Sequence, residues 1–356
     1  MNADRPLLAF TMGDPAGIGP EILVQAWRRD ALHAACRGVV VGSGAVLRRA
    51  AGRFAPGLDV VAAGSPETDG NMSSRDVLPC LDGVSSDAAD VVPAVVDRRG
   101  GQAAYDALRE ATGLARAGRV AAIVTAPLHK GALRAAGHDV PGHTELLAEF
   151  CGVRDVAMML YLPPGEGVRG AGGLGVAHVT LHVALRDIFE GITIRSVVGR
   201  IRLANQLMRR LLPPGSRAPR IGVCALNPHA GELGLFGDEE RTTIGPAVLA
   251  ARTEGHDVHG PLPADTLLVR AAEGIYDAVV AMYHDQGHVA LKLLGMHRAV
   301  NITLGLPIIR TSVAHGTAFD RAWQGTACCD GLIAAARVAA QLARSPAPSA
   351  GHDGGR

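Results

Sequence analysis

The chain has 356 residues, a formal net charge of +1, 48% hydrophobic residues and 19% charged residues. This length predicts two domains rather than one core, and the composition is that of a globular protein rather than a disordered one. The small net charge and the aromatic content of only 3% give no indication of a nucleic-acid or membrane partner.

The six cysteines show no CxxC spacing and lie mostly in apolar runs, which indicates reduced thiols rather than a disulfide framework. The N-terminal sequence MNADRPLLAFTMGD lacks the charged and then apolar pattern of a secretory signal. No apolar stretch reaches the roughly 18 residues that a membrane-spanning helix needs. We therefore expect a soluble, cytoplasmic protein.

Short apolar segments alternate with longer helical patterns along most of the chain. Strands are expected at residues 7–12, 38–43, 120–127, 156–162, 176–182, 221–227, 276–283 and 300–306. The clearest helical patterns cover 102–118 and 194–212. The predicted strands are rich in Val, Ile and Ala without polar alternation, which is typical of a sheet covered by helices on both faces. The sequence therefore predicts an α/β protein.

Three stretches interrupt this alternation. Residues 64–95, rich in Gly, Ser, Asp and Pro, are expected to form a connecting excursion. PPGEGVRGAGG (163–173) is expected to be a flexible loop or hairpin tip, and SPAPSAGHDGGR (345–356) has the composition of a disordered tail. Ligand sites in α/β folds lie at the carboxyl ends of strands, so reactive side chains at those ends are the natural candidates.

Two glycine-rich stretches are candidates for anion binding. GAGGLG (170–175) matches GxGxxG, but it follows no predicted strand and leads into a strand, so it fails as a dinucleotide-binding fingerprint. TMGDPAGIGPEI (11–22) runs from a strand into a helix that opens at Pro20 and Glu21. Its turn can present backbone N–H groups to an anion; a purely structural turn is the alternative.

Three histidines lie at the ends of predicted strands. His182 ends 176–182, and His229 and His284 follow the next two apolar runs. Any one of them is compatible with a structural role, but three at equivalent positions converge on one face of an α/β fold. Neutral imidazoles there suit a divalent ion such as Zn²⁺, Co²⁺ or Mn²⁺ with open positions for a substrate. His178 lies too early in its predicted strand to join them.

Isolated cations and carboxylates lie near the same ends. Lys292 and Arg310 occur in apolar, glycine-containing stretches, where a semi-buried cation needs an anionic partner such as a phosphate or carboxylate. Asp285 or Asp265 could orient a metal ligand from outside the coordination sphere.

Two further motifs bring polar groups to element ends. PGHTELLAE supplies His143 and Thr144 where a helix begins, and an ordinary N-cap by Thr144 is the structural alternative. TAPLHK closes another predicted strand with Lys130.

The chain resembles the 4-hydroxythreonine-4-phosphate dehydrogenase family of pyridoxal phosphate biosynthesis in seven ordered motifs: TMGDPAGIGPEI, TAPLHK, PGHTELLAE, NPHAGELGLFGDEE, GPLPADT, AMYHDQGHVALK and VNITLGLPIIRTSVAHGTAFD. The likeness covers about residues 7–340. It implies a two-domain α/β/α fold of the isocitrate/isopropylmalate dehydrogenase type, not a Rossmann fold. We expect a first, cofactor-side domain at 1–135 plus 312–344 and a second, metal- and dimer-side domain at 136–311.

The resemblance also implies the chemistry. It indicates oxidation, with decarboxylation, of a 4-phosphorylated hydroxy acid by NAD or NADP, assisted by a divalent metal (Zn, Co, Mg or Mn) that acts as a Lewis acid. The enzyme is expected to be a homodimer whose site the partner subunit completes. The expected residues are His182, His229 and His284 for the metal; His143, Thr144, Lys292, Asn301 and Arg310 for the substrate; Gly316 and Thr317 for the cofactor; and Asp265 and Lys130 for proton transfer.

Three departures from the family pattern keep alternatives open. Ala314 stands where the family usually has Asp before HGTA, and the connection between Leu162 and Gly175 is longer. His288, with LFGDEE and HGTAFD, is closer to a second branch that oxidises D-threonate or D-erythronate 4-phosphate to dihydroxyacetone phosphate. An aromatic cis-dihydrodiol dehydrogenase, which departs at the GHTE motif, and a non-redox metal-dependent sugar-phosphate enzyme are further alternatives.

Overall fold

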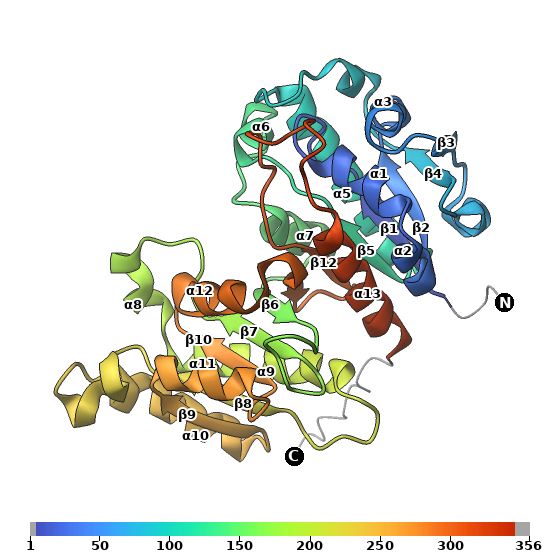
Figure 1. Cartoon of the computed structure of the whole chain (residues 1–356). Helices are drawn as coiled ribbons and strands as arrows, with labels where there is room; N and C mark the ends of the chain where they lie inside the picture. The colour runs from blue at the N-terminus through green and yellow to red at the C-terminus, as the bar shows by residue number, and fades with distance from the viewer. Residues whose placement is uncertain (1–4, 346–356) are drawn as a thin grey trace. The chain divides into compact units, whose positions relative to one another are not determined.

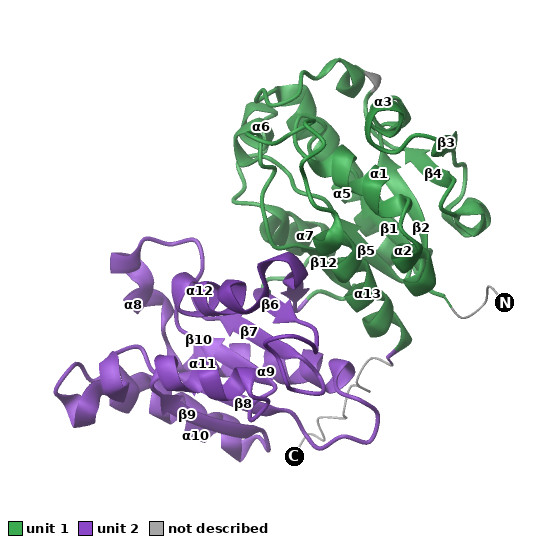
Figure 2. Cartoon of the chain, viewed as in Figure 1, with its two compact units in different colours: residues 1–156, 306–344 green, residues 157–305, 345–356 purple. Residues whose placement is uncertain are grey.

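The computed structural model describes residues 5–345, so the tail predicted from residue 345 onward lies outside the described residues except for Ser345. The chain divides into two compact units (Figure 2): unit 1 contains residues 1–156 and 306–344, and unit 2 contains 157–305 and 345–356. Each unit is an α/β structure with its own part of the sheet (Figure 1). The coarse prediction of a mixed α/β fold is confirmed.

Unit 1 is built on a parallel sheet. Its strands, in spatial order, are β3 (Asp59–Ala62), β4 (Val77–Asp82), β2 (Arg37–Gly42), β1 (Leu7–Thr11), β5 (Ala122–Thr125) and β12 (Arg310–Val313). Every residue of β1 and of β5 is buried, as expected for apolar strands with helices on both faces.

The helices of unit 1 connect these strands. They are α1 (Gly19–Trp27), α2 (Asp30–Ala35), α3 (Gly44–Phe54), α4 (Pro66–Asp69), α5 (Arg98–Arg116), α6 (Lys130–Ala135), α7 (His143–Cys151) and α13 (Asp330–Arg344), with short 3-10 turns at Gly70–Met72 and Ser86–Asp90. As the sequence predicts, α1 opens with a proline in its first turn. The second domain was predicted to begin at residue 136, whereas 136–156 lies in unit 1, because Leu146 and Leu147 of α7 belong to that unit's core.

Unit 2 has a mixed sheet. Its strands, in spatial order, are β11 (Val300–Leu304), β6 (Ala157–Leu162), β7 (Leu174–His178), β10 (Ala278–Ala281), β8 (Arg220–Cys224) and β9 (Asp257–Leu262). Strand β6 is antiparallel to both of its neighbours here, and the remaining pairs are parallel. The β6–β7 connection confirms the predicted hairpin, with an antiparallel bridge between Gly165 and Val168. GAGGLG therefore leads into a strand and not into a helix.

The helices of unit 2 are α8 (Ile188–Gly191), α9 (Ile194–Leu211), α10 (Gly245–Thr253), α11 (Ala264–Ala272) and α12 (His284–Gly295). Shorter helical turns cover Leu185–Asp187, Pro228–Gly234, Glu240–Ile244 and Met296–Arg298. The predicted helices at 102–118 and 194–212 correspond to α5 and α9. Strands β3, β4, β9 and β12 were not predicted; β4 lies inside the supposed excursion, where Pro79 and polar flanks hide its short apolar core.

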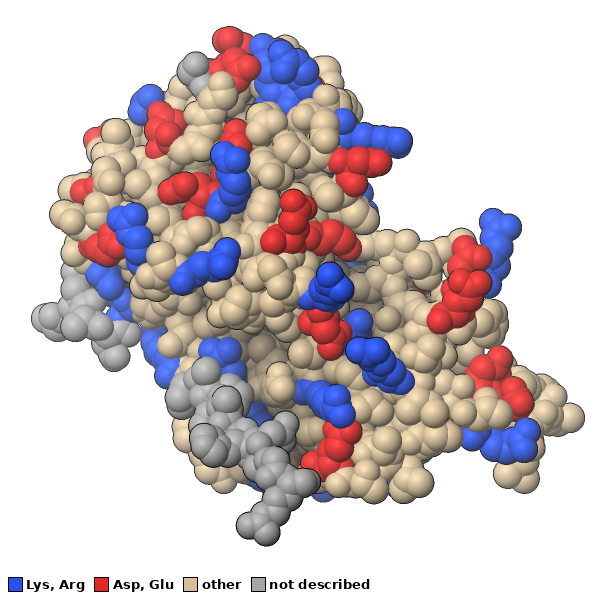
Figure 3. All heavy atoms as spheres, turned by 180° about the vertical axis from the view of Figure 1, so that it is seen from behind, with Lys and Arg blue, Asp and Glu red and all other residues tan. Residues whose placement is uncertain are grey.

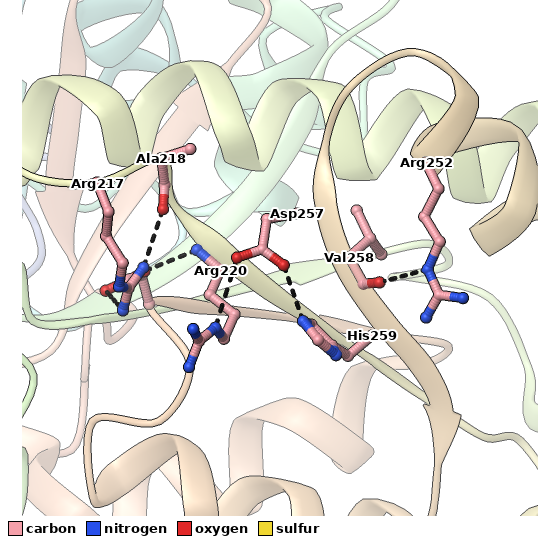
Figure 4. Close-up of polar contacts among 8 residues, drawn as sticks. Arg217, Ala218, Arg220, Arg252, Asp257, Val258 and His259 are labelled. Atoms are coloured by element: carbon pink, nitrogen blue, oxygen red, sulfur yellow. Dashed lines mark hydrogen bonds and ion pairs between the residues drawn. The ribbon is translucent and has the colours of Figure 1, made fainter.

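The amino ends of three unit 2 strands are joined by a polar network (Figure 4). The buried carboxylate of Asp277, just before β10, accepts hydrogen bonds from the backbone N–H of Arg220 (2.7 Å) and from Arg217 Nη1 (2.6 Å). Asp257 of β9 accepts from His259 at 2.8 Å and lies 3.5 Å from Arg220. These contacts tie β10, β8 and β9 together at the edge opposite their carboxyl ends, so they are structural.

The surface carries charges of both signs. On the face shown in Figure 3, Lys and Arg side chains are interspersed with Asp and Glu, in keeping with the net charge of +1. Among the described residues, no helix combines the length and apolar character needed to cross a bilayer.

Candidate active site

A buried cation lies at the centre of the predicted substrate residues of unit 1. Arg310, the first residue of β12, is only 1% exposed, and its Nε and Nη2 groups donate to Oγ1 of Thr125 at 3.2 and 2.7 Å. Burial lowers the pKa of Arg310 to about 9, and the carboxylate of Glu145 opposes this shift. The guanidinium therefore stays charged at neutral pH, in a place where an anionic ligand would be strongly attracted.

His143 lies at the start of α7, close to this cation. Helix α7 begins at His143 with Gly142 as its N-cap and no side-chain capping bond, so the alternative of an N-cap by Thr144 is wrong. Desolvation and the charge of Arg310 hold the pKa of His143 well below 6.5, against a hydrogen bond to the backbone of Ala126. The imidazole is therefore neutral at pH 7 and able both to donate and to accept.

Lys130 reaches the same helix start from α6. A Cβ atom placed on Gly142 would lie 3.8 Å from Cε of Lys130 and 3.7 Å from Oε2 of Glu145. The side chains of Lys130 and Glu145 therefore both lie beside Gly142 at the start of α7. In unit 1 the structure brings together Lys130, His143 and Arg310, three of the residues predicted from widely separated motifs.

One of the two predicted cofactor residues, Thr317, packs against the glycine-rich turn that follows β1. The carbonyl of Thr317 accepts the backbone N–H of Ile18 at 3.1 Å, and a Cβ on Gly17 would lie 3.0 Å from Cβ of Thr317. Gly316 is exposed, with open space beside its Cα. Ala314, the residue that departs from the family pattern, is half-buried directly after β12.

The same turn contains a buried carboxyl group that was not among the predicted site residues. Asp14 is 0% exposed; its Oδ1 accepts the N–H of Ala16 at 2.9 Å, and its Oδ2 has no hydrogen-bond partner among the described residues. Burial raises the pKa of Asp14 to about 6. A Cβ on Gly100 would lie 2.6 Å from Oδ1, so α5 closes over this carboxyl group. In the sequence, only the position of Asp14 inside the TMGDPAGIGPEI motif could have indicated that it lies at the site.

In unit 2 the strand ends differ from the prediction. Strand β7 ends at His178, four residues before His182, opposite the last residue of β10; the N–H groups of Val179 and Thr180 still donate to the carbonyl groups of Ala281 and Met282. Strand β10 ends at Ala281, and His284 is the first residue of α12, with Tyr283 as the N-cap. His178, which was not among the predicted ligands, is therefore the histidine at the carboxyl end of β7.

Four imidazoles gather around these ends. The ring of His284 stacks on that of His288, with centroids 3.8 Å apart and planes at 10°, and the ring centroid of His182 lies 6.2 Å from that of His284. Nδ1 of His288 lies 3.1 Å from Nε2 of the buried His178. A Cβ on Gly287 would come within 2.6 Å of that Nε2, so only glycine permits this approach. Burial is the main reason that the pKa values of His178 and His288 fall to about 3 and about 4.

The third predicted metal ligand lies on a separate loop. His229 is exposed, and it opens a run of left-handed backbone over residues 229–233. This loop is anchored by Glu240, whose carboxylate accepts the backbone N–H groups of Leu226 and Asn227, each at 2.8 Å. Within residues 5–345, no three His, Cys, Asp or Glu side chains are arranged to hold a metal ion. Imidazole is a suitable donor for the predicted ions, but the structure does not bring the three histidines together.

The other predicted residues of unit 2 lie on three elements. Lys292 is half-buried on α12, one turn after His288. Asn301 lies on β11 beside β6, and its buried Oδ1 has no hydrogen-bond partner among the described residues. Asp265 is exposed in the first turn of α11. Asn301 therefore offers an acceptor for a ligand, whereas Asp265 makes no contact that assigns it a catalytic role.

Comparison with known proteins identifies the family. The sequence profile of the family described as pyridoxal phosphate biosynthetic protein PdxA matches residues 34–339. This chain belongs to the PdxA family. The resemblance predicted from the seven motifs is thereby confirmed.

Two curated relatives of this PdxA-family chain carry different names. D-threonate 4-phosphate dehydrogenase of Pectobacterium atrosepticum is 45% identical over 338 residues, covering 95% of this chain and 99% of the relative. 4-Hydroxythreonine-4-phosphate dehydrogenase of Geobacter metallireducens is 45% identical over 340 residues, covering 96% of each. The percentage of identical residues therefore does not decide which of the two named activities this chain is closer to.

A solved structure agrees with the fold. The crystal structure of 4-hydroxythreonine-4-phosphate dehydrogenase from Klebsiella pneumoniae superposes with a TM-score of 0.83 at 43% identity, covering 95% of this chain and 100% of that chain. The PdxA-family chain thus shares the fold of that enzyme over nearly its whole length.

Proposed function

We propose that this PdxA-family chain catalyses the NAD(P)- and divalent-metal-dependent oxidation, with decarboxylation, of a 4-phosphorylated hydroxy acid. The protein is an oxidoreductase, as are its curated relatives. The observation that carries the substrate class is the buried Arg310 beside the neutral His143, with Lys130 reaching the same helix start. Arg310 is already bonded to Thr125 and lies near the carboxylate of Glu145, and a charge-assisted hydrogen bond to an anionic ligand would add to these contacts.

Two substrates fit this arrangement. 4-Hydroxythreonine-4-phosphate and D-threonate 4-phosphate are the ones for which relatives of equal identity are named. They share a phosphate, a carboxylate and a hydroxyl at C3, and they differ at C2, which bears an ammonium group in the first and a hydroxyl in the second. The residues that bind the shared groups cannot distinguish them.

The residues divide into binding and proton-transfer roles. Arg310 and Lys292 would pair with the anionic ends of the substrate, and Asn301 would orient it through its free Oδ1. His143 and Thr144 would complete the contacts at the start of α7. Lys130 is better placed than Asp265 to move a proton, because it approaches the other substrate residues of unit 1.

His182, His229 and His284 are proposed to hold the divalent ion because imidazole suits Zn²⁺, Co²⁺ and Mn²⁺; within residues 5–345 they are not arranged as a metal site, so the proposal rests on the chemistry of their side chains. Such an ion would supply Lewis-acid polarisation at the reacting hydroxyl, and a nicotinamide cofactor would supply the hydride acceptor. Gly316 and Thr317 would contact that cofactor beside the glycine-rich turn. A fold of the isocitrate/isopropylmalate dehydrogenase type is part of the same proposal.

A homodimer formed through unit 2 is also proposed. Of the large hydrophobic side chains exposed among the described residues, unit 2 carries Val183, Leu185, Phe189, Ile194, Leu233, Leu235, Phe236, Leu249, Val269, Val289, Leu293 and Met296. Unit 1 carries four, at residues 72, 92, 95 and 96. Several of the unit 2 residues lie near predicted metal ligands in sequence, so a partner covering them would also adjoin the site.

The proposal is tested by NADH formation with a panel of 4-phosphorylated acids, measured before and after treatment with a chelator. We expect turnover of 4-hydroxythreonine or D-threonate 4-phosphate that stops on chelation and returns with a divalent ion. The His229→Ala variant should keep its circular dichroism spectrum and melting temperature but lose turnover. Full activity of His229→Ala in metal-depleted buffer would overturn the metal assignment, and hydrolysis without NADH would favour the non-redox alternative.

A further inference from the structure

The proposed function uses the start of a long loop in unit 1 but not the rest of that loop. Loop 314–329 joins β12 to α13 and contains turns but no helix or strand. Gly316 and Thr317, near its start, are the residues proposed to contact the cofactor. The contacts that hold the remainder of the loop therefore decide where these two residues lie.

Two hydrogen bonds attach loop 314–329 to the glycine-rich turn after β1. The carbonyl group of Thr317 accepts the backbone N–H of Ile18 at 3.1 Å. The indole Nε1 of Trp323 donates to the carbonyl group of Pro15 at 2.9 Å. The turn contributes only backbone atoms to both bonds, so neither of them depends on a side chain of the turn.

The third attachment depends on a side chain of α1. Glu21, in the first turn of this helix, is 0% exposed, and its Oε1 accepts the backbone N–H of Ala327 at 3.1 Å. Its Oε2 has no hydrogen-bond partner among the described residues. Burying such a carboxyl group costs free energy that an apolar side chain of the same length would avoid. Attraction to the positive end of α1 is the purely structural reason for an acidic residue here.

The backbone of the loop is strained at two residues. The φ angles of Ala318 and Trp323 are +43° and +62°, a conformation that side chains other than glycine rarely adopt and that persists only where contacts enforce it. Cζ of Arg49 lies 4.5 Å from the ring centroid of Trp323. Phe319, next to Ala318, stacks on His129 with ring centroids 4.5 Å apart. Because strain opposes this conformation, each attachment of the loop shifts the balance toward it.

The same conformation leaves room for a ligand at the start of the loop. Gly316 is exposed, and no atom lies within 4 Å of a Cβ placed on it. A ligand that binds only one conformation of a loop binds more weakly in proportion to the time that the loop spends in others. The bond at Glu21, at the far end of the loop, therefore affects binding at Gly316 without touching the ligand.

We propose that Glu21 is a positioning residue, which accepts the N–H of Ala327 and so keeps loop 314–329 on α1 in the conformation that binds the nicotinamide cofactor. This inference rests on the proposed function for the cofactor contact of Gly316 and Thr317. It requires a hydrogen-bond acceptor at residue 21 rather than a negative charge.

Three variants and a control separate the acceptor from the charge and from packing. Glu21→Gln keeps an acceptor oxygen and removes the charge, whereas Glu21→Met keeps the length of the side chain and removes both. Trp323→Phe removes the donor to Pro15 but keeps an aromatic ring. Glu110→Met is the matched control, because Glu110 is exposed on α5.

Four measurements are made on each protein. Hydrogen exchange of peptides from 314–329, read by mass spectrometry without any ligand, reports how often the loop opens. Calorimetric titration with NAD⁺ and with NADP⁺ gives the dissociation constant of the cofactor. Steady-state kinetics with a 4-phosphorylated acid separate kcat from the KM of each substrate. The melting temperature distinguishes loosening of the loop from a loss of global stability.

We expect loop peptides of Glu21→Met to exchange roughly three- to ten-fold faster than those of the wild type, as for the loss of one hydrogen bond. The dissociation constant and KM of the cofactor should rise about two-fold or more, while kcat at saturating cofactor and the KM of the acid stay nearly constant. The melting temperature should stay the same or rise, because an apolar side chain replaces a buried carboxyl group. Trp323→Phe should likewise loosen the loop and weaken cofactor binding. Glu21→Gln and Glu110→Met should stay close to the wild type.

Unchanged exchange of the loop in Glu21→Met would overturn the inference, as would faster exchange with an unchanged dissociation constant of the cofactor. Equal losses in Glu21→Gln and Glu21→Met would show that the charge at the start of α1 is what matters. A Glu21→Met chain that melts far below the wild type would show that Glu21 supports the core instead. A wild type that binds neither NAD⁺ nor NADP⁺ would refute the proposed function, and exchange without nucleotide would still decide whether Glu21 holds the loop.

Discussion

At the scale of single residues, unit 1 buries a cation and a carboxyl group in different settings. Arg310 is held by Thr125 and influenced by Glu145, so its charge is kept in place. Asp14 uses one oxygen and leaves the other without a partner among the described residues. Burying either group in the folded protein costs free energy. Replacing either residue should therefore have a measurable effect.

Replacing Arg310 with Met should reduce kcat/KM for a 4-phosphorylated substrate by roughly ten- to hundred-fold, because a charge-assisted hydrogen bond contributes about 1.5–3 kcal/mol. The loss should be much smaller for a dephosphorylated analogue, which lacks most of the charge that Arg310 meets. The melting temperature should fall little, since Met fills a similar volume without a buried charge. An equal kinetic loss with and without the phosphate would remove Arg310 from phosphate binding.

The buried carboxyl group of Asp14 should make the free energy of unfolding depend on pH. Its pKa is raised from 3.8 to about 6 in the folded chain, so the folded state binds more protons than the unfolded state between these values, and stability falls as the pH rises through them. Asp14→Asn cannot ionise and should therefore stabilise the protein at pH 7.5 by roughly 2–3 kcal/mol relative to the wild type.

The gain from Asp14→Asn should largely disappear near pH 3.5, where the wild-type carboxyl group is protonated in the folded state and mostly protonated in the unfolded state. Urea unfolding at the two pH values measures the difference. A gain of equal size at both would show that the ionisation of Asp14 is not its cause.

At the scale of elements, helix α12 carries His284, His288 and Lys292 in one row along a single face. His284 at its start, His288 in its second turn and Lys292 in its third are fixed relative to one another by helix geometry. The contact of α12 with β7 depends on Gly287, where a Cβ would lie 2.5 Å from Cγ1 of Val176. This contact decides how closely the imidazoles approach.

Gly287→Ala should therefore destabilise the protein by about 1–3 kcal/mol through overpacking, although Gly to Ala within a helix is ordinarily stabilising by about 0.5–1 kcal/mol. It should also separate His288 from His178. Gly113→Ala in α5 is the matched control, since no atom lies within 4 Å of the added Cβ, and it should raise the melting temperature. Similar shifts for both variants would contradict the close contact.

At the scale of the whole molecule, the exposed apolar residues of unit 2 lead to a prediction about assembly. If the site is completed by a partner subunit, mixing inactive His229→Ala chains with inactive Lys292→Ala chains should restore activity. Mixed dimers would then contain one intact site, giving up to about a quarter of wild-type activity at equal mixing. Size-exclusion chromatography of the mixture checks that dimers form. If confirmed mixed dimers show no recovered activity, His229 and Lys292 of one site come from the same subunit.

Much of this molecule follows from sequence pattern. Buried parallel strands carry unbroken runs of Val, Ile and Ala, so eight of the strands, the long helices α5 and α9, and the turn from β1 into α1 were predictable. The order of seven motifs was sufficient for the family. Residues such as Arg310 could be selected because a cation within an apolar run is costly to bury unless an anion or a polar partner meets it.

Tertiary structure decided what depends on contacts between distant segments. Strand β4 escaped prediction because its pairing with β2 and β3, rather than its composition, stabilises it. Strand β7 ends at His178, which lies opposite Ala281, the last residue of β10, and periodicity does not show that point. The His178–His288 pair requires a glycine on one element to meet an imidazole from another. Sequence spacing indicates which residues carry chemistry, but only packing determines which of them touch.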